Sequence, residues 1–408
     1  MPQAGEPMPR IALLENPIRE YDWGSRSAIA ELLGRPSPSA APQAELWMGA
    51  HPSAPSAVVL AGVRRSLLAW IEESPKELLG PRVQAGFEAR LPFLLKVLAA
   101  DRPLSIQAHP DAAQAREGFA RENATGIPLD AVERCYRDAS HKPELLCALT
   151  PFWALRGFRA PHEILALAAQ LAVAELDAAA ACLRTGGEGE ALSAWLRGLF
   201  ALAPEARVRL VRAVARAAVE RADADVGFEW IARLQQLHRD DVGVLAPLFL
   251  HTLRLEPGEA IFLPARELHA YLQGVGIELM ASSDNVLRGG LTTKPLAIEE
   301  LLRVLRFQPA RPVLLRAQRD TSGWERYATP ALEFELARAT LRGGPPIASA
   351  QERGIEILLC TEGEVELAPA DAQPRVRLAQ GASCIVPAAA GAYRASGRGT
   401  LFRASVPF

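Results

Sequence analysis

The chain has 408 residues, which is too long for one ordinary hydrophobic core, so two or three domains are expected. Its 45 lysine and arginine residues nearly balance 47 aspartate and glutamate residues. The net charge of -2 gives no electrostatic reason to bind nucleic acid or an anionic membrane, so a small molecule is the expected partner. The sequence does not set the oligomeric state, and a monomer is compatible with it.

Residues 1–17 carry prolines and acids where an export signal needs a continuous apolar stretch, so a cytoplasmic location is expected. The most apolar long run, residues 164–183, is interrupted by Gln170, Glu175 and Asp177, which predicts a helix of a water-soluble domain and no membrane span. Five cysteines without CxxC spacing argue against a disulfide framework and against a thiolate metal site.

Proline usage divides the chain, because proline is excluded from helix interiors and is common in the turns of sheet proteins. Residues 1–160 hold 17 prolines and include the strand-like stretches LPFLLKVLAA (91–100) and PLSIQAHP (103–110). Residues 161–243 hold two prolines and show apolar residues at helical spacing, with TGGEGE (185–190) as a predicted loop between helices. Residues 244–408 hold 13 prolines and return to short strands such as EAIFLP (259–264), IEILLC (355–360) and ASCIVP (382–387).

An internal repeat refines this division. GEAIFLPARELH (258–269) fits the cupin pattern of Gly258, Pro264 and a metal-binding His269, with Arg266 in place of the usual second glycine. GASCIVPAAAGA (381–392) keeps the glycine and proline at the same spacing but has Ala392 in place of the histidine. We therefore predict a mainly β fold with an α-helical insertion, made of tandem cupin-type jelly-roll barrels plus a helical domain. Residues 1–160 with 244–310 would form the catalytic barrel, 161–243 the inserted helical domain, and 311–408 a second barrel without the ligand histidine.

A candidate metal site follows from the strand period of two. In PLSIQAHP this period places Ser105, Gln107 and His109 on one face, and in HKPELL it places Lys142 with Glu144. Buried polar groups need partners, and a metal ion would satisfy the Gln107 amide oxygen and the His109 imidazole together. Glu144 and His269 would complete a set of nitrogen and oxygen ligands that Zn²⁺ accepts, as do iron(II), manganese and cobalt.

Several long strings resemble the type I mannose-6-phosphate isomerase family, in the same order and across most of the chain. They are LPFLLKVLAADRPLSIQAHPD, HKPELLCAL, FWALRGFR and LPARELHAYLQGVGIELMASSDNVLRGGLTTK, with NPIREYDWGS and ELWMGAHPSAPS near the N-terminus. The resemblance implies a cupin-superfamily enzyme that interconverts D-mannose 6-phosphate and D-fructose 6-phosphate. It also implies one Zn²⁺ held by Gln107, His109, Glu144 and His269, and an active-site role for Arg288.

Such an isomerase moves a proton between neighbouring carbons through an enediolate, whose oxygen charge zinc and Arg288 would stabilise. The base remains open between Lys142, for which burial beside a metal favours the neutral amine, and Glu278. His141 and Asp284 are candidates to assist ring opening. Candidates for substrate binding are Lys294 and Ser105 for the phosphate, then Lys96, with Tyr271 for a sugar hydroxyl and Trp23 at the mouth of the site.

Three alternatives are weighed against this interpretation. A sugar-phosphate-binding cupin without catalysis would bind ligand but exchange no C2 proton with solvent. A cupin oxygenase using iron(II) would rely on two histidines and one carboxylate, and Gln107 and the intact SDNVLRGGLT string (283–292) disfavour it. A nucleotide-dependent sugar enzyme is disfavoured because GVG at 274–276 lacks the rest of a dinucleotide fingerprint.

Overall fold

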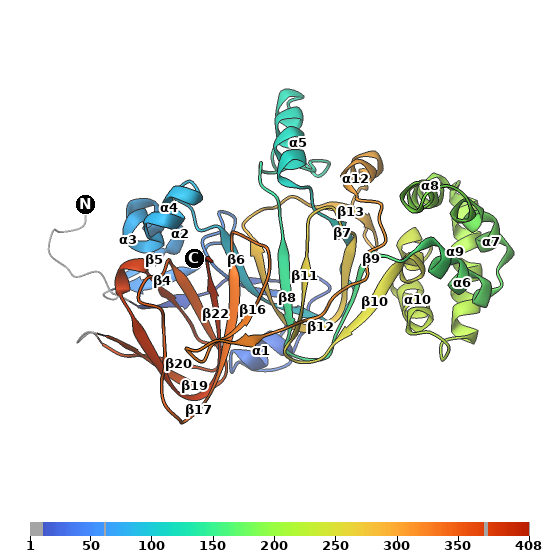
Figure 1. The fold of residues 1–408 in the computed structure, drawn as a ribbon. Helices are drawn as coiled ribbons and strands as arrows, with labels where there is room; N and C mark the ends of the chain where they lie inside the picture. The colour runs from blue at the N-terminus through green and yellow to red at the C-terminus, as the bar shows by residue number, and fades with distance from the viewer. Residues whose placement is uncertain (1–10, 61–62, 371–373, 408) are drawn as a thin grey trace.

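The computed structural model describes residues 11–60, 63–370 and 374–407. Two eleven-stranded antiparallel sheets form the body of the molecule, and a block of helices lies at one end of it (Figure 1). This architecture confirms the predicted mainly β fold with an α-helical insertion. Among the described helices, none combines the length and the apolar character needed to cross a bilayer.

The first sheet is organised around one long strand, β12 (His269–Ala281). The first residues of β12 pair with β7 (Ile106–Ala108) and β9 (Phe152–Phe158), while its later residues pair with β6 (Phe93–Ala100) and β8 (Glu144–Ala148). The register shifts between Tyr271 and Gln273, where the strand changes partners. Gly274 follows with φ +131°, and a Cβ there would lie 2.7 Å from the Phe152 ring, so this bend requires glycine.

The remaining strands of this sheet complete the wall around the predicted site. β11 (Glu259–Leu263) pairs with β8, and β13 (Leu287–Gly290) pairs with β7. β6 also pairs with β3 (Glu45–Met48), which continues to β2 (Ile18–Arg19), and β11 continues to β14 (Leu315–Arg316).

The second sheet joins the two ends of the chain. Its C-terminal strands are β17 (Glu335–Arg342), β19 (Glu356–Pro369), β21 (Ser383–Val386) and β22 (Tyr393–Ser405), with the shorter β15 (Gln318–Arg319), β16 (Glu325–Tyr327), β18 (Ile347–Ala348) and β20 (Val376–Ala379). β21 pairs with β1 (Ala12–Glu15), which continues to β4 (Ala57–Leu60) and β5 (Val63–Ser66). This differs from our assignment of residues 1–160 to the first barrel, because strand pairing between chain ends leaves no local signal in sequence.

The helical block lies between two strands that are neighbours in the first sheet, β9 and β10 (Leu250–Leu255). Its members are α6 (Pro161–Leu171), α7 (Ala174–Ala179), η1 (Ala180–Arg184), α8 (Glu188–Ala201), α9 (Pro204–Glu220), α10 (Val226–Leu237), η2 (Val242–Leu245) and α11 (Ala246–Phe249). The block thus continues beyond the predicted residue 243. The TGGEGE stretch connects η1 to α8, as predicted.

Other helices lie outside this block. They are α1 (Ala28–Leu32), α2 (Leu67–Glu73), α3 (Pro75–Leu79) and α4 (Pro81–Gly86) near the second sheet, and α5 (Ala112–Ala124) and α12 (Ile298–Val304) beside the predicted site (Figure 1). α5 begins with a capping box in which the Asp111 carboxylate accepts from the Ala113 and Gln114 amides.

The predicted repeat has a backbone basis. Gly258 and Gly381 have φ angles of +87° and +80°, and each precedes a short strand, β11 or β21. Arg266, which replaces the second glycine, also has a positive φ of +70°. The backbone at this position is therefore left-handed, and a residue with a side chain is strained in that conformation. After these turns, His269 opens β12 and Ala392 directly precedes β22.

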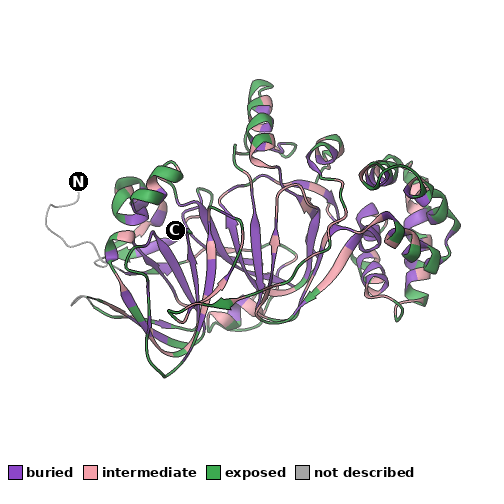
Figure 2. Ribbon diagram, viewed as in Figure 1, coloured by how far each residue is buried: buried purple, intermediate pink, exposed green. Residues whose placement is uncertain are grey.

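The two sheets share one hydrophobic core. It combines Leu145 and Ile277 of the first sheet with Leu336 and Ile357 of the second. Figure 2 shows the buried residues running along the strands of both sheets, while the outer helices have exposed outward faces. The first sheet, which carries the predicted metal ligands, is therefore held rigidly against the C-terminal strands.

Candidate metal centre

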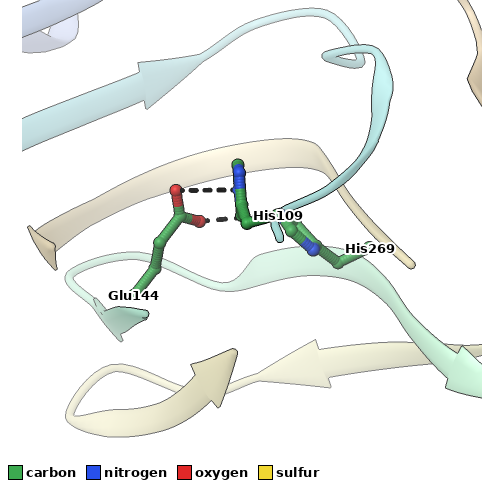
Figure 3. A group of neighbouring side chains, drawn as sticks. All are labelled: His109, Glu144 and His269. Carbon is green, nitrogen blue, oxygen red and sulfur yellow. Dashed lines mark ion pairs between the residues drawn. The ribbon is translucent and has the colours of Figure 1, made fainter. Parts of the chain in front are cut away.

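Three ligand-type side chains converge at the end of the first sheet (Figure 3). His109 directly follows β7, Glu144 opens β8 and His269 opens β12, and all three are at most 3% exposed. Glu144 Oε1 lies 3.2 Å from His109 Nε2, and Glu144 Oε2 lies 3.5 Å from His269 Nε2. Ligand atoms about 2.0–2.2 Å from a tetrahedral zinc lie roughly 3.3–3.6 Å apart, so these spacings fit such an ion.

The protonation of both imidazoles is fixed by backbone carbonyls. His109 Nδ1 donates to the carbonyl of Asn285 (2.6 Å), and His269 Nδ1 donates to the carbonyl of Glu267 (3.1 Å). Each Nε2 therefore directs a lone pair at the Glu144 carboxylate, and His109 Nε2 is buried without a hydrogen bond. Three acceptors facing one another repel unless a cation lies between them, so the donor set fits a metal ion.

The electrostatics of the ligands agree with this assignment. Burial lowers the pKa of His109 to about 4, so its imidazole is neutral and able to bind a metal at neutral pH. Burial alone would raise the pKa of Glu144, but the charge of Lys142 holds it well below its usual value. Glu144 is therefore a carboxylate, and Lys142 Nζ lies 2.9 Å from its Oε1.

Gln107 lies beside this group. It is opposite His269 in the β7–β12 pairing and opposite Arg288 in the β7–β13 pairing. Its amide nitrogen donates to Ser105 Oγ (3.2 Å), which leaves the amide oxygen as the acceptor. Ser105 and Gln107 are half-buried, whereas Ile106 and Ala108, which alternate with them along the strand, are buried in the core, as the strand period predicts.

A second buried charge group lies on the central strands of the same sheet. Lys96 Nζ, on β6, lies 2.9 Å from Glu278 Oε2 and 3.3 Å from Glu45 Oε1, and Glu45 also accepts from the Trp47 indole (2.8 Å). Burial raises the pKa of Glu278 while Lys96 opposes the increase, and the two carboxylates raise the pKa of Lys96 against its burial. Lys96 is thus already paired with protein carboxylates.

Three cations, Arg137, Arg288 and Lys294, lie close enough to one another for their charges to interact. Burial and the charge of Arg137 lower the pKa of Arg288, and burial with the charges of Arg288 and Arg137 lowers the pKa of Lys294. Within the described part of the chain, none of these three side chains forms an ion pair with a carboxylate. The uncompensated positive charge fits a dianionic ligand group such as a phosphate.

The segment 283–285 connects several of these groups. Asp284 Oδ1 lies 3.4 Å from His51 Nε2, and the Asp284 amide donates to Asp138 (2.8 Å). Although burial acts to raise it, the pKa of Asp284 is lowered by the hydrogen bond and charge of His51. Asn285 is fully buried, and its side chain bonds the backbone of Arg137, Asp138 and Ser140.

The other predicted residues lie at the margin of this group. His141 Nε2 lies 2.6 Å from Glu333 Oε1, so its partner comes from the segment before β17. Tyr271 is buried against Phe152 in the core of the sheet, with burial raising the pKa of its hydroxyl. Trp23 is half-buried, stacks on Tyr21 (5.7 Å between centroids) and packs against the same cluster.

Sequence reasoning missed three residues of this neighbourhood. His51 has no metal-type spacing in the sequence, yet tertiary structure brings it to Asp284. Arg137 and Asn285 were not assigned a site role, since a side chain that bonds backbone groups 145 to 148 positions away has no local signature. The one available signal is the dense polar string 137–142, RDASHK, which ends two residues before Glu144.

A carboxylate and two neutral histidines, held at the end of an antiparallel sheet, are the donor set of a metal-dependent cupin-type protein. Beside them lies a group of cations that form no ion pair within the described residues. Comparisons with known proteins narrow this class. The model of the type I phosphomannose isomerase catalytic domain matches residues 11–161. This match, together with a curated relative that is 40% identical over 96% of this chain, shows that the chain belongs to the type I phosphomannose isomerase family.

Similarity to curated proteins extends over almost the whole chain. The mannose-6-phosphate isomerase of Escherichia coli (strain K12) is 40% identical over 395 residues, covering 96% of this chain and 98% of that protein. The Homo sapiens protein of the same name is 33% identical over 362 residues, covering 82% of this chain and 83% of its own.

Solved structures agree in three dimensions. A zinc-bound mannose 6-phosphate isomerase superposes with a TM-score of 0.91 at 38% identity, covering 98% of this chain and 100% of that chain. The Salmonella typhimurium enzyme bound to fructose 6-phosphate and zinc gives a TM-score of 0.90 at 38% identity, with the same coverage.

Proposed function

We propose that this protein interconverts D-mannose 6-phosphate and D-fructose 6-phosphate with one Zn²⁺ held by Gln107, His109, Glu144 and His269. The observation that carries the proposal is the convergence of two unprotonated imidazole nitrogens on one carboxylate, 3.2 and 3.5 Å away. Family membership supplies the reaction, and the zinc and fructose 6-phosphate of the similar structures support the cofactor and the substrate.

Zinc, when bound, supplies Lewis-acid stabilisation of the charge that develops on a sugar oxygen during enolisation. The three unpaired cations, Arg137, Arg288 and Lys294, would hold the phosphate, and the Ser105 hydroxyl would donate to it. Arg288 lies opposite Gln107 in the β7–β13 pairing, so the same side chain would also face the sugar. Binding the phosphate firmly would orient C1 and C2 toward the proton-transfer group.

Two side chains remain as candidates to move the proton between C1 and C2. Lys142 is 8% exposed, and its Nζ lies 2.9 Å from the metal ligand Glu144, which places the amine at the metal group. Glu278 is a carboxyl whose pKa burial raises, which brings a general base closer to neutral pH, but its oxygen is already bonded to Lys96. Lys142 is favoured as the proton-transfer group because it contacts the metal ligand Glu144.

The test replaces His269 with alanine and measures bound zinc together with isomerase turnover on mannose 6-phosphate. We expect loss of zinc and at least a 100-fold fall in turnover, because the metal stabilises the charged intermediate. His238→Ala, at the C-terminal end of α10 in the helical block and outside the metal group, is the matched control and should retain both. Normal turnover in a zinc-free His269→Ala protein would contradict the proposal.

A further inference from the structure

The candidate ring-opening residue, His141, has a partner that comes from the other end of the chain. His141 lies in the segment that leads into β8, three residues before Glu144. Its Nε2 is 2.6 Å from Oε1 of Glu333, a residue 192 positions later. Glu333 lies two residues before β17, a strand of the second sheet. The sheet without a metal histidine therefore contributes a carboxylate to the catalytic side.

Glu333 is held in place from several directions. Its second oxygen accepts from the Leu332 amide (3.2 Å), and its side chain is only 15% exposed. The neighbouring Phe334 and Ala331 are buried in the core that the two sheets share. The carboxylate is therefore preorganised, whereas the His141 side chain remains 35% exposed and open to a ligand.

This contact determines which ring nitrogen of His141 is available. The carboxylate accepts the Nε2 proton, so Nδ1 is the nitrogen that carries the free lone pair. The hydrogen bond to Glu333 raises the pKa of His141 against its partial burial, with Asp111 adding to the increase and Arg116 of α5 opposing it. A base whose second nitrogen is oriented by a carboxylate is the arrangement that activates histidine in other enzymes.

We propose that Glu333 is a positioning residue of the isomerase site, which orients His141 so that Nδ1 performs the proton transfers of sugar ring opening. This inference rests on the proposed isomerase function. In ring opening, Nδ1 takes the proton of the O1 hydroxyl while the C1–O5 bond breaks. The imidazolium, stabilised by Glu333, then returns a proton to O5, which gives the open-chain aldehyde with no net change in protons or electrons.

The test uses the zinc-loaded full chain, mannose 6-phosphate and its C2-deuterated form. Glu333→Gln should lower kcat/KM about 10-fold or more, a part of the roughly 10²- to 10⁴-fold that general acid–base catalysis provides. Because ring opening would become the slow step, the C2 isotope effect on kcat/KM should shrink toward 1. A merely structural defect at Lys142 and Glu144 would slow proton transfer at C2 and leave this isotope effect unchanged or larger.

Two further variants make the result specific. Glu333→Asp keeps the carboxylate and should recover part of the rate; it also serves as the test variant if Glu333→Gln does not fold. Tyr327→Phe is the matched control, since the Tyr327 hydroxyl donates to the Gly258 carbonyl (2.8 Å) at the same boundary without touching His141. It should keep the wild-type isotope effect.

A double-mutant cycle completes the experiment. In a His141→Asn background, Glu333→Gln should cause no further loss, because its effect passes through the imidazole. Additive losses, or a folded Glu333→Gln protein with wild-type rate and isotope effect, would overturn the inference. Absence of isomerase activity in the wild-type protein would instead refute the underlying function, so the two failures are distinguishable.

Discussion

At the scale of single residues, the site depends on side chains that bond backbone groups. Asn285 joins both parts of the centre, because its carbonyl accepts from the ligand His109 while its amide bonds the segment that carries Arg137 and leads to Lys142. A buried amide with all of its hydrogen-bonding groups engaged is hard to replace.

We expect Asn285→Ala to lower the free energy of unfolding by about 2–4 kcal/mol, because it removes a buried side chain that bonds the backbone of Arg137, Asp138 and Ser140. Urea denaturation measures this loss. Asn123→Ala is the control, since Asn123 is exposed and accepts one hydrogen bond, from Arg134, so it should cost about 1 kcal/mol or less. Equal losses in the two variants would show that the Asn285 network contributes little.

At the scale of elements, α5 is adapted to the segment it packs on. A Cβ at Gly118 would lie 2.4 Å from the ring of Tyr136, a buried residue whose hydroxyl donates to Glu300 of α12 (2.6 Å). A glycine in the interior of this helix therefore lets the Tyr136 ring pack close to the helix backbone. Arg137 is the next residue in the chain.

Glycine-to-alanine changes in two helices should thus have opposite signs. Gly118→Ala should destabilise the protein by about 1–3 kcal/mol, because the Tyr136 ring must move. Gly198→Ala in α8, where a Cβ would meet nothing within 4 Å, should stabilise it by about 0.5–1 kcal/mol through helix propensity. Thermal denaturation of both variants measures these changes in stability, and a stabilising Gly118→Ala would contradict the packing argument.

The elements also show which features of the fold and the site could be predicted from the sequence. The period of two in PLSIQAHP and HKPELL predicted which side chains share a face, and the structure brings His109, Glu144 and His269 together. The pairing of β1 with β21 could not be predicted, because Leu13 and Cys384 become neighbours only through tertiary structure. The contacts of Asn285 and Glu333 could not be predicted from the sequence for the same reason.

At the scale of the whole molecule, the His141–Glu333 pair links the two sheets and should make their association depend on pH. Glu333 raises the pKa of His141 above its ordinary value of 6.5, so this contribution is complete below pH 6.5 and is lost as the pH rises through the raised value. The His141 hydrogen bond lowers the pKa of Glu333 against its burial, so that contribution is present above pH 4.5 and is lost as the pH falls.

The stability difference between the wild-type protein and Glu333→Gln should therefore be largest between about pH 4.5 and 6.5. Urea midpoints measured at pH 5.5 and pH 8.5 test this, with Tyr327→Phe as a variant whose destabilisation should not change between the two conditions. A constant difference for Glu333→Gln would show that the pair remains neutral.

The position of the helical block also bears on how the centre is assembled during folding. β9 and β10 are neighbours, yet the Arg159 side chain donates to a Leu250 carbonyl 91 positions away, with the whole block between them. Joining them costs chain entropy that the local contacts of compact helices reduce. His269 follows the block in sequence, so during synthesis it is made only after the whole helical block. The complete set of metal ligands therefore cannot assemble before the ribosome has passed residue 269.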